Sequence, residues 1–179
     1  EPISCRLMFD LLKTAGADRI MSVDLHAAQS QGFFDGPVDH LIAMPVLVDY
    51  IRDRFSNQLD NVAVVSPDAG RIRVAEQWAQ RLGGGPLAFV HKTRDITRPN
   101  QAVANRVVGD VEGKDCVLVD DLIDTAGTIA GACSVLKDAG AKSVTVVATH
   151  GVLSGPAVER LKNSGAREVV LTDTVPIPE

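Results

Sequence analysis

Two carboxylates end a short apolar run near the middle of the chain. Residues 116–119 (Cys-Val-Leu-Val) show no polar alternation, which is typical of a strand buried on both faces of a parallel sheet. Asp120 and Asp121 follow at once. Because a buried, unpaired charge is costly, these acids must meet water, a metal ion or a ligand. The acid pair therefore predicts a strand that ends at a functional edge of the sheet.

Small residues separate these acids from a helical pattern. Residues 124–128 (Asp-Thr-Ala-Gly-Thr) precede apolar positions spaced as one face of a helix, namely Ile129, Ala132, Cys133 and Leu136. A loop of small residues lets backbone N–H groups approach a phosphate, and a helix start adds partial positive charge. Carboxylates accept hydrogen bonds from sugar hydroxyls. The combination predicts a ribose phosphate, with its phosphate in the loop and its diol on the acids.

A simpler interpretation of the loop remains open at this level. Asp124 or Thr125 could cap the following helix, and Asp-Thr-Ala-Gly is a plausible connecting turn. The strand and the acid pair before the loop favour ligand binding over capping alone.

Composition limits the classes of protein that the chain can represent. Of its 179 residues 45% are hydrophobic, enough for a packed core, and a net charge of −5 argues against bulk binding to nucleic acid or anionic membrane. No apolar stretch approaches membrane length. The scattered Cys5, Cys116 and Cys133 suit buried thiols in a reducing compartment, so we expect a cytoplasmic protein.

Valine-rich runs alternate with helical patterns along most of the chain. Strands are expected near 19–23, 61–65, 87–90, 116–119, 143–148 and 168–171. This spacing predicts an α/β fold with an open, mostly parallel sheet flanked by helices on both faces. A helix is also expected over 5–15, with Leu7, Met8, Leu11 and Leu12 on its buried side.

Other polar residues follow the expected strands, where ligands collect in open α/β sheets. His26 follows the first strand, Asp68 the second, and Lys92 and Arg94 the third, before a polar loop over 95–105. Each has a structural alternative: a structural histidine, a helix cap and a solvated basic strand end. Local sequence alone leaves these alternatives open.

Residues 120–128 resemble the phosphoribosyl-binding loop of the type I phosphoribosyltransferase superfamily. The segment from Asp24-Leu-His26 to Phe34, together with Lys92-Thr-Arg94, narrows the resemblance to ribose-phosphate pyrophosphokinases of the common bacterial kind. These enzymes transfer the diphosphoryl group of ATP to O1 of ribose 5-phosphate, giving phosphoribosyl pyrophosphate (PRPP) and AMP. The resemblance implies Mg2+ as cofactor.

The resemblance also implies roles for single residues. Lys92 and Arg94 would be catalytic and stabilise charge on the transferring group, with Arg94 also contacting ribose 5-phosphate; His26 and Asp68 would meet Mg2+. The remaining contacts to ribose 5-phosphate would come from Asp120, Asp121, Asp124, Thr125, Ala126, Gly127 and Thr128.

Two positions depart from the family pattern. Gln31 and Asp39 match a regulatory nucleotide site, but His40 replaces an asparagine common there. Arg71 stands where many relatives carry glycine, and we expect it to add positive charge beside the pyrophosphate.

The resemblance predicts two domains. Residues 1–43 would be the tail of an N-terminal phosphoribosyltransferase-like domain, and 44–179 a similar C-terminal domain, incomplete at its end. The family forms dimers that build hexamers, and its adenine site uses the first domain and a neighbouring subunit. We therefore expect a fragment of a homo-oligomer that turns over poorly alone.

Two other functions stay open. A phosphoribosyltransferase would share the loop but consume PRPP, and the Asp24-Leu-His26 and Lys92-Thr-Arg94 segments argue against it. The second possible function is that of a non-catalytic regulator of the synthetase. Such relatives tend to lose loop residues, whereas this chain keeps Lys92, Arg94, Asp120 and Thr128.

Overall fold

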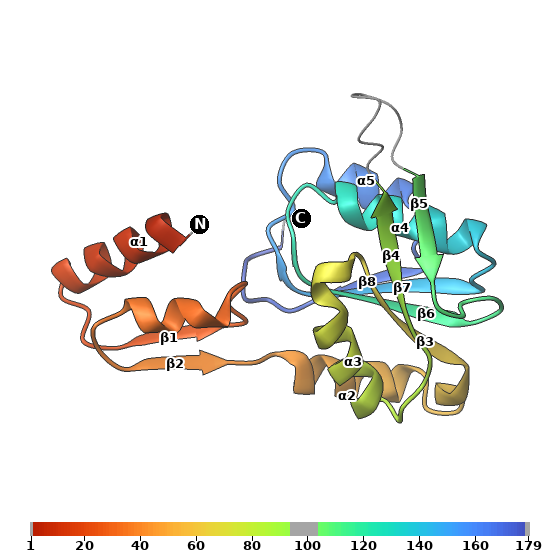
Figure 1. Ribbon diagram of the computed structural model, residues 1–179, viewed down its shortest axis with the longest axis horizontal. Helices are drawn as coiled ribbons and strands as arrows, with labels where there is room; N and C mark the ends of the chain where they lie inside the picture. The colour runs from red at the N-terminus through yellow and green to blue at the C-terminus, as the bar shows by residue number, and fades with distance from the viewer. Residues whose placement is uncertain (1, 94–103, 178–179) are drawn as a thin grey trace. The chain divides into compact units, whose positions relative to one another are not determined.

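Two compact units make up the chain, Glu1–Pro45 and Val46–Glu179. The computed structural model describes residues 2–93 and 104–177 (Figure 1). The first unit holds helix α1 (Pro2–Thr14), strand β1 (Ile20–Val23), the 3-10 helix η1 (Ala28–Phe33) and strand β2 (Val38–Leu41). β1 and β2 pair in parallel, with Ile20 opposite Val38. That the first unit is the tail of a larger domain stays a prediction.

The apolar side predicted for α1 is not buried within this unit. Leu7, Met8, Leu11 and Leu12 are between 42% and 58% exposed, so the prediction of their burial was wrong. Phe9 of α1 is buried, with its ring 6.1 Å from the ring of Phe34. Helical periodicity identifies a face that can be buried, but it does not supply a surface to cover that face.

The second unit is a six-stranded sheet with helices on both faces. Its strands run in the order β5-β4-β3-β6-β7-β8, and every neighbouring pair is parallel except β4 and β5. This confirms the predicted α/β fold with a mostly parallel sheet. The strands are β3 (Val62–Ser66), β4 (Leu87–Thr93), β5 (Ala104–Val108), β6 (Asp115–Ile123), β7 (Ser143–Gly151) and β8 (Glu168–Leu171). The helices are α2 (Met44–Arg54), α3 (Ile72–Arg81), α4 (Gly127–Asp138) and α5 (Ala157–Asn163), with 3-10 turns η2 (Leu59–Asn61) and η3 (Ala69–Arg71).

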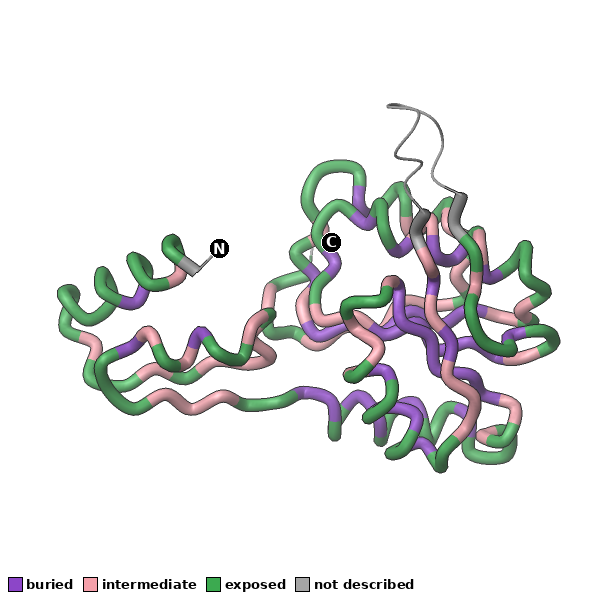
Figure 2. The backbone as a smooth tube through the Cα atoms, in the orientation of Figure 1, coloured by how far each residue is buried: buried purple, intermediate pink, exposed green. Residues whose placement is uncertain are grey.

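Alternating valines along the strands fill both faces of this sheet. In the second unit α2 and α3 cover one face, and α4 and α5 cover the other (Figure 1). Side chains of β3, β6 and β7 at every second position pack with α4, through Ile129, Ala132, Cys133 and Leu136. Figure 2 shows these central strands as the most continuously buried part of the unit. Cys116 and Cys133 are buried in this core, as predicted, whereas Cys5 is half-buried.

The strand order reverses between β3 and β6. From β3 the chain passes to β4 on one side, and from β6 it passes to β7 and β8 on the other. At such a reversal the helices that follow the two strands lie on opposite faces, which leaves a crevice beyond the carboxyl ends of the strands. The loops after β3 and β6 border this crevice, so the topology itself marks the place for a ligand. Within the ranges that the structure describes, no helix has the length and apolar character needed to span a bilayer.

Asp115 is a buried charge at the opposite, amino end of β6. It is 1% exposed, and its carboxylate accepts hydrogen bonds from Lys142 Nζ at 2.8 Å and Ser143 Oγ at 2.7 Å. Burial alone would raise its pKa, but the hydrogen bonds from Lys142 and Ser143 outweigh burial and the pKa is lowered. These contacts tie β6 to the start of β7.

We predict that Asp115→Asn lowers the free energy of unfolding by about 2 kcal/mol near pH 7, since it weakens several hydrogen bonds to a buried charge. A lowered folded-state pKa means that this contribution is present above the pKa of an unfolded aspartate, about 4, and is lost as the pH falls through the folded value. Denaturant unfolding of the wild type and the variant checks both points. The exposed Asp138→Asn is the control, and a difference that stays constant down to pH 3 would contradict the prediction.

Candidate functional site

A small cavity lies where β6 meets α4. Its volume is about 170 Å³, and its lining includes Asp120 and the loop 124–128. The structure therefore brings Asp120 and the predicted loop residues 124–128 together in one hollow at the carboxyl end of β6, whereas Asp121 is not among the residues that line it. Asp124, Thr125, Gly127 and Thr128 are exposed there, whereas Ala126 is buried.

The amino end of α4 carries no side-chain cap. Ala126 is its N-cap residue and no side chain accepts a hydrogen bond there. The alternative in which Asp124 or Thr125 caps this helix is therefore wrong. The first turn of a helix has N–H groups without intrahelical acceptors and carries partial positive charge, so an anion is favoured at this end.

Backbone carbonyl groups at the start of the loop accept hydrogen bonds from the segment that follows β7. Leu153 N donates to Ile123 O at 3.0 Å, Ser154 N to Asp124 O at 3.0 Å, and Arg160 Nη1 to Thr125 O at 2.9 Å. Three successive carbonyls are thus engaged by the segment from β7 to α5. Sequence reasoning missed Arg160, because no local pattern links an exposed arginine on one helix to a loop 35 residues earlier.

The acid pair is not symmetric. Asp121 N donates to Asp120 Oδ1 at 2.9 Å, and the carboxylate of Asp121 forms an ion pair with Arg71. Burial and then the neighbouring Asp121 raise the pKa of Asp120 to about 7, while Arg71 acts in the opposite direction. The positive charge expected from Arg71 is present, but its guanidinium contacts an acid of the predicted diol site.

The loop after β3 is braced by its own polar groups. Asp68 Oδ1 accepts from Gly70 N at 2.8 Å, and Ser66 Oγ donates to Asp68 O at 2.6 Å. Asp68 therefore acts as the N-cap of η3, which is the structural role given above as the alternative to a metal contact. A carboxylate has two oxygens and several acceptor positions, so this capping bond is compatible with a further ligand.

The predicted catalytic cations lie only partly within the described chain. The backbone of Lys92 is near the carboxyl end of β4, opposite Asn105 of β5. Because β3, β4 and β6 are parallel, that end shares the sheet edge of Asp68 and Asp120. The side chain of Lys92 and the whole of Arg94 lie outside the described residues. So does most of the predicted loop over 95–105, although β5 begins at Ala104, within the last two residues of that predicted loop.

Residues of the first unit with predicted roles have local partners. His40 Nε2 accepts from Leu25 N at 2.9 Å, and Gln31 Nε2 lies 3.2 Å from His40 Nδ1. Asp39 forms a bidentate ion pair with Arg19, at 2.5 and 3.0 Å. The hydrogen bond and charge of Arg19 lower the pKa of Asp39. His26 is exposed, and its role, like the regulatory role of Gln31 and Asp39, stays a prediction.

The described residues contain no group of three or more His, Cys, Asp or Glu side chains placed to hold a metal ion. Mg2+ in nucleotide enzymes usually takes one or two protein carboxylates, substrate phosphates and waters. A single strand-end carboxylate such as Asp68 has the right donor chemistry for that arrangement.

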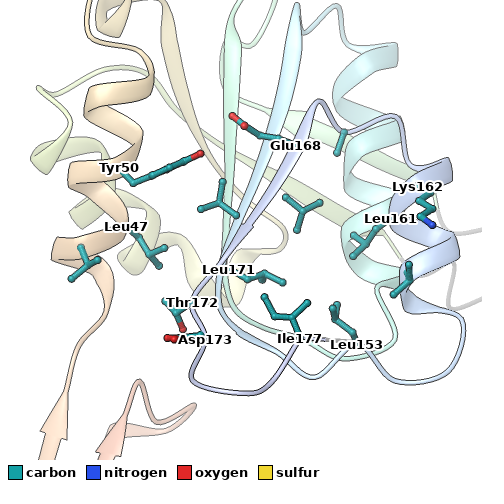
Figure 3. Close-up of a pocket in the computed structure, with 15 residues that line it drawn as sticks. Leu47, Tyr50, Leu153, Leu161, Lys162, Glu168, Leu171, Thr172, Asp173 and Ile177 are labelled. Carbon is teal, nitrogen blue, oxygen red and sulfur yellow. The ribbon is translucent and has the colours of Figure 1, made fainter. Parts of the chain in front are cut away.

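A larger groove lies elsewhere in the second unit, along the edge strand β8 (Figure 3). Its volume is about 900 Å³, and α2 and α5 border it. Most of its lining is apolar, including Leu47, Tyr50, Leu161, Leu171 and Ile177. A sugar phosphate would find few hydrogen-bond donors there, so the small polar hollow after β6 fits such a ligand better.

Comparison with known proteins agrees with this fold. A model of the phosphoribosyl synthetase-associated domain matches residues 95–178. A ribose-phosphate pyrophosphokinase of Bifidobacterium longum is 95% identical over all 179 residues, which cover 53% of that protein. The crystal structure of phosphoribosylpyrophosphate synthetase from Mycobacterium smegmatis matches with a TM-score of 0.91 and 61% identity, over 100% of this chain and 56% of that one. Orotate phosphoribosyltransferase from Aeropyrum pernix matches with a TM-score of 0.53 and 28% identity, over 72% of this chain and 70% of that one.

The fold is that of the type I phosphoribosyltransferase class. Within this class the chain is similar over its whole length to ribose-phosphate pyrophosphokinases. It spans about half the length of the curated relatives it matches.

Ala126 gives a test of the loop geometry. Its φ of 59° lies in the left-handed region, which a residue with a Cβ rarely adopts. We predict that Ala126→Val lowers the free energy of unfolding by about 2 kcal/mol or more, because a branched side chain is strained there. Ala126→Gly should change it by less than about 1 kcal/mol, as relief of strain offsets the lost methyl.

Denaturant unfolding measures both variants of Ala126. Ala130→Val, within α4 itself, is the matched control for added volume in the same helix. A cost for Ala126→Val no larger than that of the control would show that the left-handed conformation is not a constraint.

Proposed function

We propose that the protein containing this chain is a ribose-phosphate diphosphokinase. It transfers the diphosphoryl group of ATP to O1 of ribose 5-phosphate and releases PRPP and AMP. The main support is the uncapped amino end of α4, which lies beside the Asp120–Asp121 pair at the strand-order reversal. The similarity to ribose-phosphate pyrophosphokinases supports the same reaction.

The two halves of the sugar phosphate have different partners in this proposal. The 5-phosphate binds the N–H groups and hydroxyls of the loop 124–128, where the start of α4 favours negative charge. The ribose diol donates hydrogen bonds to Asp120 and Asp121. A sugar held at both ends presents its 1-hydroxyl in one orientation, which lowers the entropic cost of the transfer.

Charge stabilisation comes from the neighbouring strand end. The 1-hydroxyl attacks the β-phosphorus of ATP, the bond from that phosphorus to the α–β bridging oxygen breaks, and AMP leaves. Lys92 and Arg94 stabilise the negative charge on the transferring group and on AMP, as phosphoryl transfer requires. Asp68 would hold Mg2+ at this strand end, where the ion would neutralise charge on the phosphates. A contact of His26 with Mg2+ is proposed as well. Gln31 and Asp39 form a regulatory nucleotide site.

We also propose that the protein is cytoplasmic and that its dimers assemble into a hexamer. The other candidates differ in measurable products: a phosphoribosyltransferase consumes PRPP in exchange with a base, and a regulator forms no AMP by itself. Incubation with ATP and ribose 5-phosphate therefore separates all three.

The first prediction from this proposal is that the natural-length protein forms AMP and PRPP in equal amounts from ATP and ribose 5-phosphate. Thr128→Val should raise the KM for ribose 5-phosphate about tenfold, because one hydrogen bond to a charged phosphate is lost. Ser134→Ala, an exposed position later in α4, is the control. If the wild type formed no AMP, the proposal would be wrong. An unchanged KM in the variant would show that the 5-phosphate does not bind at this loop.

The second prediction concerns residues 1–179 as a separate polypeptide. It should bind ribose 5-phosphate more weakly than the natural-length protein and form PRPP far more slowly, since it spans about half of its relatives. Calorimetry and an AMP assay on both polypeptides make the comparison. A PRPP-forming rate equal to that of the natural-length protein would contradict the prediction.

A further inference from the structure

Arg71 joins two loops that the proposed function treats separately. It ends η3, after β3, and its guanidinium forms an ion pair with the carboxylate of Asp121 on β6. These two residues are 50 positions apart in the chain. β3 and β6 are parallel neighbours, with Val65, close to the carboxyl end of β3, opposite Leu118 of β6. The pair therefore spans the crevice at the strand-order reversal.

The surroundings of this ion pair favour a defined geometry. The side chain of Arg71 is 19% exposed and that of Asp121 is 13% exposed, so water and salt screen the pair less than they screen surface charges. The planar guanidinium forms directional hydrogen bonds with a carboxylate, which restricts both side chains. Removal of one partner would leave the other partly buried without this opposing charge.

The anchors on either side of the pair make its effect local. Before Arg71, the hydrogen bonds of Ser66 and Gly70 to Asp68 brace the loop after β3. Beside Asp121, its own N–H donates to Asp120 Oδ1 and orients that carboxylate. The position of Asp121 therefore affects both carboxylates: its backbone N–H orients that of Asp120, and its own side chain is held by Arg71.

We infer that Arg71 is a positioning residue for the sugar diol, acting through Asp121 by tying the loop after β3 to the acid pair after β6. The inference rests on the proposed function for the identity of the sugar. It differs from the expectation that Arg71 supplies charge to the pyrophosphate directly. An arginine that acts through Asp121 affects binding of ribose 5-phosphate, whereas one that contacts the diphosphoryl group affects ATP binding or turnover.

A double-mutant cycle in the natural-length protein separates these roles. We expect Arg71→Met to raise the KM for ribose 5-phosphate about tenfold while kcat and the KM for ATP change less than about threefold, because substrate positioning is lost and the transferring group is not touched. Arg71→Lys should recover part of the loss. Arg73→Met is the matched control, since Arg73 is an exposed arginine two residues later in α3.

The coupling between the two side chains is the decisive measurement. Asp121→Asn should raise the same KM, and the double variant Arg71→Met/Asp121→Asn should be no worse than Asp121→Asn alone, because Arg71 then has no charge to position. Calorimetric titration with ribose 5-phosphate should give the same order of affinities without turnover.

Three results would overturn the inference. Additive effects of the two substitutions would show that Arg71 acts independently of Asp121. A loss confined to kcat or to the KM for ATP would place Arg71 on the diphosphoryl group. A lower melting temperature with an unchanged KM for ribose 5-phosphate would leave it a structural role only. A wild type that neither forms AMP nor binds ribose 5-phosphate would instead end the proposed function, and the inference with it.

Discussion

The structure of the site depends on one electrostatic constraint, the burial of β6 up to the residue before its acid pair. Residues 115–119 are all buried, and the chain then presents Asp120 and Asp121 where the strand reaches the edge of the core. Burial, and then repulsion between the two adjacent carboxylates, raises the pKa of Asp120. Arg71 opposes that repulsion from one side. The polar edge of the sheet is stable because charges of both signs meet there.

Helix α4 contributes the second half of the same electrostatic arrangement. It starts at Gly127, only four residues after Ile123, the last residue of β6, and no side chain caps its amino end. Its uncompensated N–H groups face a hollow that also receives the carboxylate of Asp120. A ligand with an anionic end and a neutral hydroxylated end satisfies both at once. An anion without hydroxyl groups would be repelled by the carboxylates. A neutral sugar would leave the start of α4 without the anion that it favours.

Much of this could be predicted from the sequence, because the informative patterns are local. Unbroken valine runs indicate strands buried on both faces, and the acids and small residues after residue 119 are adjacent in the chain. The pairing of Arg71 with Asp121 and of Arg160 with Thr125 could not be predicted, since each depends on how parallel strands and a distant helix pack. The cap of α4 was ambiguous for a different reason: whether Asp124 or Thr125 accepts from the helix depends on backbone angles, and the left-handed Ala126 decides it. For α1, periodicity identified an apolar face but not what covers it.

The central claim is that a sugar phosphate binds with its phosphate at the start of α4 and its diol on the acid pair. A crystal structure of the natural-length protein with ribose 5-phosphate tests it most directly. The account predicts phosphate oxygens within about 2.7–3.2 Å of the backbone nitrogens of residues 125–128, and ribose hydroxyls at the same distance from Asp120 or Asp121. A bound ribose 5-phosphate elsewhere on the protein, with the start of α4 left without an anion at saturating concentration, would contradict it.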